Sequence, residues 1–258
     1  MKERVYILAT CRKAELLAGT LLVFRTVRTG FPTAEIVVHG NGLGEFTPAV
    51  RAACEEVGAH YLNVLPTVHD EWIEMLLQDE RRPFWICDTD VIFWSAVEQW
   101  RFDTALSGLH QAEFFEQFTR TNYRERLHTC LMRLDPKRFR EETQEYLSQF
   151  PKMPFHPRID LVRQQWQPER HGDRVVNYFA DTLAVAWHAL GGSAFSEEQL
   201  DCFDHVSCAT YADLMAPAYA DTDMLAAHKM IYEEPGRARG LWRQQRAYFE
   251  KGKPCLTR

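Results

Sequence analysis

The amino-acid sequence predicts an α/β fold, with a mixed but mainly parallel sheet flanked by helices and a helical C-terminal region. In the first 90 residues, short apolar segments rich in β-formers alternate with segments whose apolar residues recur at helical spacing. This alternation implies right-handed crossovers and a parallel sheet covered by helices. The chain has 258 residues, of which 46% are hydrophobic, and this length allows one large domain with a substantial core.

Four strands and three helices are expected in this first part. The strands are short apolar runs that end at glycine or polar residues, and they cover residues 5–9, 34–39, 61–65 and 84–87. The helices cover residues 13–28, residues 48–57 and a segment that begins at Asp70, which has a side chain suited to an N-cap. Gly30 ends the first helix, Gly58 follows the second and Pro83 follows the third.

The rest of the chain has a less regular pattern. Further strands of a mixed sheet are expected at residues 103–110, 127–134 and 203–210. Helices are expected at residues 136–150, at residues 178–190 and from residue 223 onward. Residues 151–167 contain three prolines without a clear period, which predicts a loop and a candidate lid. No segment has the composition of a linker, so residues 1–258 are expected to form a single domain.

Composition excludes several classes of protein. A formal net charge of -6 argues against a protein whose whole surface binds nucleic acid, although a local basic patch remains compatible with it. The seven cysteines are scattered and form no C-x-x-C pair, so neither a zinc knuckle nor a disulfide framework is expected. No apolar run approaches the roughly 18 residues of a membrane span. The N-terminus lacks the pattern of a signal peptide, so a cytoplasmic location is expected.

The segment Asp88-Thr89-Asp90 follows the fourth expected strand directly. Ligands of parallel sheets bind at the carboxyl ends of the strands, and alternating side chains of an extended segment share one side, so Asp88 and Asp90 can share one partner. Two carboxylates so close repel each other unless a cation lies between them. Mg²⁺ and Mn²⁺ bind carboxylates together with substrate phosphates. The segment therefore predicts a divalent-metal site, and the alternative is that both acids cap turns in a surface loop.

The residues 84–93, with the sequence FWICDTDVIF, resemble the D-x-D region of GT-A-type glycosyltransferases, and the order of elements is similar along most of the chain. The resemblance implies that Asp90 binds Mn²⁺ or Mg²⁺ directly, and that Asp88 contacts the metal or the ribose of a nucleotide-sugar donor. It also implies a nucleotide-binding half at residues 1–100. Residues 101–258 would then form the acceptor-binding half with a C-terminal helical cap.

Further site residues follow from the same resemblance. The family's nucleotide pocket lies at the end of the first strand, which here comprises Ala9, Thr10, Cys11 and Arg12. Asn41, after the second strand, is a weaker candidate for a contact with the base or ribose. Lys229 is a candidate for contact with the leaving diphosphate.

The resemblance also implies a late metal ligand and a catalytic base. Such enzymes often use a histidine near the C-terminus as a metal ligand, and His205 matches that position, with His228 as its rival. Inverting members place an acidic base between the D-x-D segment and the late histidine, where this chain has Asp181. A base of this kind removes the proton of the acceptor hydroxyl. Asp181 can equally be a helix N-cap.

Positive charge and aromatic residues gather near the C-terminus, at Arg237, Arg239, Trp242, Arg243, Arg246, Tyr248, Lys251 and Lys253. Three interpretations are open. The segment can be a solvated helix face, a cap that donates Lys229 or Arg237 to the leaving diphosphate, or a surface for a nucleic-acid acceptor.

The expected function is metal-dependent transfer of a sugar from a nucleotide-sugar donor, with a UDP-sugar as the default, to an acceptor hydroxyl. The acceptor can be a glycan, a protein, a small molecule or hydroxymethylated DNA. A phosphatase similar to the haloacid dehalogenases is one alternative, with Asp88 as its nucleophile, although Ile92 stands where that motif carries a small or hydroxyl residue. A non-catalytic protein that binds a nucleotide or glycan on the same fold is the other alternative.

Overall fold

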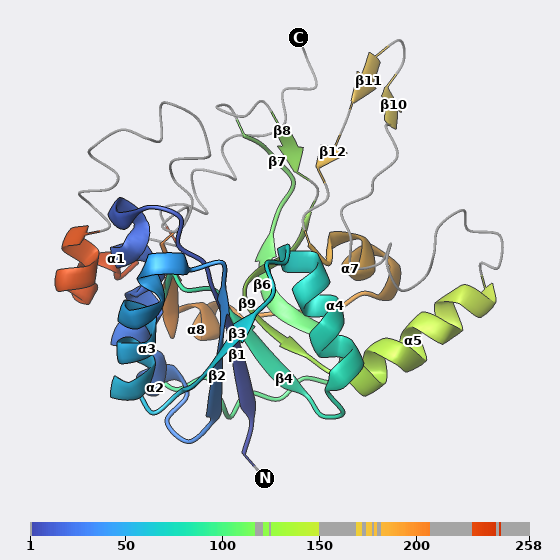
Figure 1. Cartoon of the computed structure of the whole chain (residues 1–258). Helices are drawn as coiled ribbons and strands as arrows, with labels where there is room; N and C mark the ends of the chain where they lie inside the picture. The colour runs from blue at the N-terminus through green and yellow to red at the C-terminus, as the bar shows by residue number, and fades with distance from the viewer. Residues whose placement is uncertain are drawn as a thin grey trace. The chain divides into compact units, whose positions relative to one another are not determined.

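The computed structural model describes residues 2–116, 121–123, 125–149, 169–171, 174–176, 178–179, 182–206, 229–240 and 243. The chain divides into two compact units. Figure 1 labels the helices and strands that belong to them. The first unit contains Met1–Thr67, Phe84–Arg101 and Ser196–Gln244, and the second contains Val68–Pro83, Phe102–Phe195 and Gln245–Arg258. Within the residues that the structure describes, no helix is both long enough and apolar enough to cross a lipid bilayer.

A parallel sheet with the strand order β4-β1-β2-β3 forms the centre of the first unit. Its strands are β1 (Arg4–Ala9), β2 (Glu35–Asn41), β3 (His60–Val64) and β4 (Phe84–Cys87). Val5 of β1 pairs with Ile36 on one side and with Trp85 on the other, and both neighbouring strands run parallel to β1. The predicted α/β fold with a mainly parallel sheet is confirmed. The carboxyl ends of β1 and β4 are therefore neighbours at one edge of the sheet.

The segment between β1 and β2 corrects the predicted continuous helix at residues 13–28. It consists of four short pieces, η1 (Ala14–Leu16), α1 (Leu17–Thr20), η2 (Leu22–Arg25) and α2 (Val27–Gly30). The amide of Val23 donates to the carbonyl of Thr89 at 2.7 Å, and the hydroxyl of Thr26 accepts a hydrogen bond from the amide of Phe93 at 2.8 Å. The helix breaks because these residues bond to the chain around the aspartate pair.

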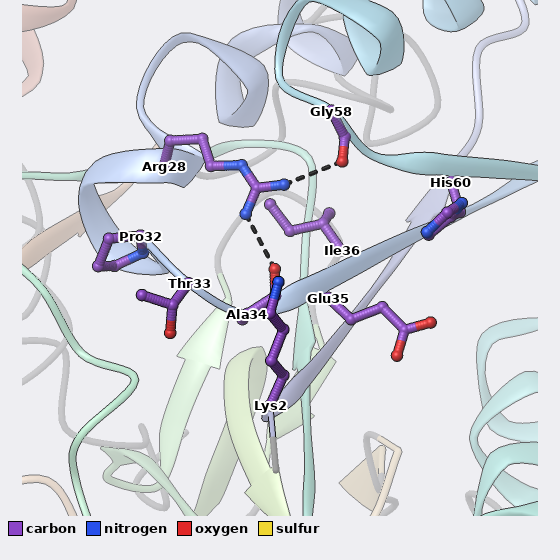
Figure 2. Close-up of a pocket in the computed structure, with 9 residues that line it drawn as sticks. All are labelled: Lys2, Arg28, Pro32, Thr33, Ala34, Glu35, Ile36, Gly58 and His60. Atoms are coloured by element: carbon purple, nitrogen blue, oxygen red, sulfur yellow. Dashed lines mark hydrogen bonds between the residues drawn. The ribbon is translucent and has the colours of Figure 1, made fainter.

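The second helix of the first unit, α3 (Thr47–Glu56), agrees with the prediction for residues 48–57 and packs against β2 and β3. Arg28, in α2 of the preceding segment, connects the chain before β2 to the residues that follow α3. Its guanidinium donates to the carbonyls of Val57, Ala34 and Gly58 at 2.7, 2.9 and 2.9 Å, and Figure 2 shows the last two of these bonds. Arg28 therefore has a structural role, because its N–H groups bind main-chain oxygen atoms.

The later part of the first unit contains α8 (Glu197–Leu200), β14 (Phe203–His205) and η4 (Pro235–Ala238). The side chain of Ser196 accepts a hydrogen bond from the Gln199 amide and completes a capping box at the start of α8. β14 confirms the start of the strand predicted at residues 203–210, whereas residues 207–210 lie outside the described part. Of the helical region predicted from residue 223 onward, the structure describes residues 229–240 and 243, and residues 229–233 are helical.

Within the second unit, three strands pair in the order β13-β6-β9. Its strands are β6 (Leu106–Gln111), β9 (Arg126–Leu134) and β13 (Ser193–Ala194), where β6 runs antiparallel to β9 and parallel to β13. The strands predicted at residues 103–110 and 127–134 are thus present, with a later start for the first. Shorter strands are β7 (Phe114–Glu116), β8 (Thr121–Tyr123), β10 (Glu169–His171), β11 (Arg174–Val176) and β12 (Tyr178–Phe179).

Among its described residues, the second unit contains three helices, namely α4 (His69–Asp79), α5 (Pro136–Gln149) and α7 (Ala184–Leu190). The N-cap of α4 is Val68 and Asp70 lies in the first turn, so the predicted N-cap was wrong. The helix predicted at residues 178–190 begins at Ala184, because Leu183 has the left-handed φ of 64°. The candidate lid at residues 151–167 lies outside the described residues.

Candidate functional site

The aspartate pair lies at the carboxyl edge of the first unit's sheet, where ligands of parallel sheets bind. Asp88 to Asp90 connect β4 to the short strand β5 (Val91–Phe93). Asp88 is half-buried, whereas Thr89 and Asp90 are each 3% exposed. The bond from the Val23 amide to the Thr89 carbonyl fixes the middle of this connection. This hydrogen bond ties the connection that carries both carboxylates to the segment around Val23.

The short strand β14 brings His205 to this turn. β14 pairs antiparallel with β5, and His205 lies opposite Val91, the residue that follows Asp90. The amide of Val206 donates to the carbonyl of Asp90 at 2.8 Å and continues the ladder past His205. A residue more than one hundred positions later in the chain thus reaches the aspartate pair through main-chain pairing.

The Nε2 atom of His205 lies 3.3 Å from the Oδ1 atom of Asp90, and each side chain is 4% exposed. One ligand atom each of Asp88, Asp90 and His205 lies within 4.8 Å of the others. Among the described residues, Oδ1 of Asp90 has His205 as an ion-pair partner but accepts no hydrogen bond of good geometry, and a buried carboxylate oxygen that lacks such a bond is costly. The two carboxylates are suitable ligands for Mn²⁺ or Mg²⁺, and the imidazole is a ligand for transition metals, so the three residues fit the predicted metal best as Mn²⁺.

Electrostatic interactions couple the three side chains. Burial by itself lowers the pKa of His205, but the negative charge of Asp90 beside the ring, with that of Asp88, outweighs burial and raises this pKa above its ordinary value. Burial raises the pKa of the Cys87 thiol strongly, and Asp88 and Asp90 raise it further. Cys87 therefore stays a neutral thiol, and the two carboxylates favour the protonated form of His205.

The predicted donor-binding residues lie in different settings. Ala9 ends β1 and is fully buried, the carbonyl of Thr10 accepts a hydrogen bond from Thr20 at 2.8 Å, and Arg12 is exposed. Ala9 is the last residue of β1, the strand next to β4, and Thr10 and Arg12 follow it. Lys229 is exposed at the start of the described residues 229–240. The structure does not test their contact with a donor.

Asn41 ends β2, but its amide group already has partners. Its Nδ2 atom donates to the carbonyl of Thr67 at 2.9 Å, and its Oδ1 atom accepts from the amide of Thr67 at 3.0 Å. These two bonds fasten the loop after β3 to the end of β2. Asn41 thus has a structural role, and its contact with a base or ribose remains a prediction.

Several predicted residues lie outside the described part of the chain. They are the proposed base Asp181, the rival ligand His228, and the basic or aromatic residues Trp242, Arg246, Tyr248, Lys251 and Lys253. Three cations of the C-terminal segment are described: Arg237 pairs with Glu234, Arg239 lies over the ring of Trp94, and Arg243 pairs with Asp201. These contacts leave the three interpretations of the segment open.

A pocket of about 470 Å³ lies at the opposite ends of the same strands. Figure 2 shows that Lys2, which precedes β1, and Glu35 and His60, which begin β2 and β3, contribute to its lining. Ligands of parallel sheets bind at the carboxyl ends, so this pocket is distinct from the candidate metal site.

Sequence analysis missed residues that build the site without being ligands. Asp204, beside His205, is 3% exposed and accepts a hydrogen bond from Nε1 of Trp94 at 2.7 Å. The sequence contained one signal for it, an acidic residue inside an apolar strand, where an unpaired charge is costly. The main-chain bond of Val23 left no sequence signal, because every non-proline residue carries an amide.

No family model matches the chain, and no curated protein matches it. Similar solved structures include the WbbM bifunctional glycosyltransferase, with 12% identity and a TM-score of 0.39 over 62% of this chain and 36% of that chain. The chain thus matches little more than a third of WbbM. Mannosyltransferase PcManGT from Pyrobaculum calidifontis, in complex with GDP-Man and Mn²⁺, has 12% identity and a TM-score of 0.41 over 99% of this chain and 76% of its own.

Nucleotidyltransferases are among the similar structures as well. A putative glucose-1-phosphate thymidylyltransferase from Bacillus anthracis has 10% identity and a TM-score of 0.44, over 88% of this chain and 95% of that chain. At these identities and TM-scores the likeness supports no conclusion about the activity of this protein.

Proposed function

We propose that this protein is a metal-dependent glycosyltransferase that transfers a sugar from a nucleotide-sugar donor to an acceptor hydroxyl. The observation that supports the proposal is the cluster of Asp88, Asp90 and His205, whose ligand atoms lie within 4.8 Å of one another at the carboxyl end of β4. A divalent cation at this edge of a parallel sheet is suited to bind a nucleoside diphosphate.

The three side chains have different roles in this proposal. Asp90 and His205 bind Mn²⁺ or Mg²⁺ directly, because both are buried and their ligand atoms lie 3.3 Å apart. Asp88 is half-buried and contacts the cation or the donor ribose. The bound cation would act as a Lewis acid toward the departing nucleoside diphosphate.

Other residues of the chain would bind the donor and the acceptor. Ala9, Thr10 and Arg12 would line the nucleotide pocket, since they lie at or just after the end of β1, the strand beside β4. Lys229 would contact the leaving diphosphate through its ammonium group. Asp181 is the proposed base that removes the proton of the acceptor hydroxyl. The donor is a UDP-sugar in this proposal, and the acceptor class stays open.

A panel of nucleotide sugars, assayed for donor hydrolysis and binding with and without Mn²⁺, tests the proposal. Hydrolysis of one donor, dependent on Mn²⁺ and lost in Asp90→Asn, is the expected result. Asp201→Asn is the matched control, because Asp201 is exposed and pairs with Arg243 on the surface. If no nucleotide sugar of the panel is bound or hydrolysed, the proposal is contradicted.

Two other results would redirect the assignment. Turnover of an aryl phosphate that is abolished in Asp88→Asn would support the phosphatase alternative, because that chemistry uses the first aspartate as nucleophile. Tight binding of a nucleoside diphosphate, without hydrolysis of its sugar conjugates or transfer to any acceptor, would support a non-catalytic binding protein.

A further inference from the structure

The buried carboxylate of Asp204 lies one residue before His205 in β14. Successive side chains of a strand point to opposite faces, so Asp204 faces away from the side that His205 presents. Within the described part of the chain, its Oδ2 atom accepts hydrogen bonds from Nε1 of Trp94 at 2.7 Å and from the amide of Gly240 at 2.8 Å. Asp204 therefore joins the strand that carries His205 to two separate segments of the first unit.

The ladder that holds His205 in place is short. β5 and β14 have three residues each, and an isolated two-stranded ladder of this size is at best marginally stable. A slip of one residue would move every side chain of β14 to the other face and would remove His205 from Asp90. The bond between the side chains of Asp204 and Trp94 opposes such a slip, because Trp94 directly follows β5.

The second partner of Asp204 belongs to residues 229–240, which pack on the same face of the ladder. Asp204 lies opposite Ile92, and Ile92 is buried in a cluster with Val206, Ile231 and Ala238. The last two of these residues come from the segment 229–240. The segment is therefore held by apolar contacts to the ladder that carries His205.

The end of this segment is fitted closely to Asp204. Gly240 has a φ of 83°, a conformation that L side chains rarely adopt, and in this conformation its amide reaches Oδ2 of Asp204. The guanidinium of Arg239 lies 5.7 Å from the centroid of the Trp94 ring, within range of a cation–π interaction. The conformation of Gly240 thus orients one donor to Asp204, and the contact with Arg239 helps to orient the other, the indole of Trp94.

We infer that Asp204 is a positioning residue that couples cation binding at Asp88, Asp90 and His205 to the docking of residues 229–240. The inference rests on the proposed function for the presence of the cation. A cation that binds His205 stabilises β14, and through Asp204 it stabilises the segment that ends at Gly240. Coupling of this kind is reciprocal, so loss of the Asp204 anchor weakens cation binding.

The affinity for Mn²⁺ in the full chain, measured from the EPR signal of free Mn²⁺, tests one direction of the coupling. Asp204→Ala should weaken Mn²⁺ binding by about tenfold, the range for residues that orient metal ligands. Asp204→Asn keeps an accepting oxygen and should lose less of the affinity for Mn²⁺. Trp94→Phe removes the indole N–H and should weaken binding in the same direction. Asp201→Asn is the matched control, since it breaks an exposed ion pair with Arg243 and should leave the affinity unchanged.

Hydrogen exchange of the backbone at residues 229–240 tests the other direction. Mn²⁺ should slow exchange there in the wild-type chain, and this protection should disappear in Asp204→Ala. A role of Asp204 in stability alone would speed exchange equally with and without Mn²⁺, so the dependence on Mn²⁺ separates the two roles. If Asp204→Ala does not fold, Trp94→Phe decides the question by the same two measurements.

The outcomes separate this inference from the proposed function. If the wild-type chain binds Mn²⁺ and the folded variants bind it equally well, the coupling is refuted and the metal site stands. The same conclusion follows if Mn²⁺ leaves exchange at residues 229–240 unchanged in the wild type. If the wild-type chain binds no Mn²⁺, the metal site and the coupling are refuted together.

Discussion

Nε2 of His205 and Oδ1 of Asp90 lie 3.3 Å apart, and both side chains are almost fully buried. A protonated His205 places positive charge beside the carboxylates of Asp90 and Asp88. A bound divalent cation would place positive charge at the same location. A metal ligand must be the neutral imidazole, so a proton and a metal ion compete for Nε2. This relationship leads to two predictions about the site.

The first prediction concerns the pH dependence of the free energy of unfolding in EDTA. The pKa of His205 is raised in the folded protein. The His205–Asp90 pair therefore contributes stability that is fully present below the ordinary value of 6.5 and is lost as the pH rises through the raised pKa. Urea denaturation should show this loss in the wild type and not in His205→Gln. An identical pH profile for both proteins would contradict the assignment of the pair.

The second prediction concerns stabilisation by metal. Mn²⁺ at about 100 times its dissociation constant should stabilise the folded chain by about 2.7 kcal/mol, because it binds the folded state alone. Asp90→Asn should lose most of this effect at the same concentration, since a carboxylate ligand becomes a neutral amide. Thermal unfolding with and without Mn²⁺ measures the stabilisation, and Mn²⁺ should stabilise Asp201→Asn as much as the wild type. An equal response of Asp90→Asn would argue that Mn²⁺ binds elsewhere.

Thr26 provides a third test, which concerns the scaffold of the site. Its hydroxyl accepts the amide of Phe93 at 2.8 Å, and Phe93 belongs to β5. Thr26→Ala leaves that amide without its partner and should cost about 1–3 kcal/mol of unfolding free energy. Thr26→Ser keeps the hydroxyl and should cost less. Equal losses in the two variants would show that the methyl group, rather than the hydrogen bond, stabilises this contact.

Gly30 provides a fourth test, because a side chain has no room at this position. A Cβ atom on Gly30 would overlap the ring of Phe93, which is 1% exposed and packs edge-on against Phe31. Gly30→Ala should therefore destabilise the protein by about 1–3 kcal/mol. Gly236→Ala is the control, since nothing lies within 4 Å of its Cβ position. Chemical denaturation should separate the two, and equal stability would refute the close approach to Phe93.

Strands with strong local patterns could be predicted from the sequence. β1, β2 and β4 are short apolar runs, and the alternation with helices predicted their parallel pairing. The position of Asp88 and Asp90 at a carboxyl edge follows from this order alone. The group of Asp88, Asp90 and His205 agrees with what the resemblance to a family implied, although the chain itself gives His205 no local signal.

Features that depend on distant partners could not be predicted. Helical spacing at residues 13–28 favoured one helix, but the Val23 amide bonds to Thr89, a residue 66 positions later, and the helix breaks. The left-handed Leu183 delays α7 without any glycine to mark the position. Asp204 is recognisable as an anchor when Trp94 and Gly240 are seen beside it. In each case a tertiary contact overrides local preference.

The most direct test of the central claim is a crystal structure of the protein with Mn²⁺ and UDP, with anomalous scattering recorded at the manganese absorption edge. The account predicts an anomalous peak bound by Asp90 and His205, with Asp88 at the same ion or at the ribose, and the diphosphate of UDP on the ion. A manganese peak away from Asp90 would contradict the account.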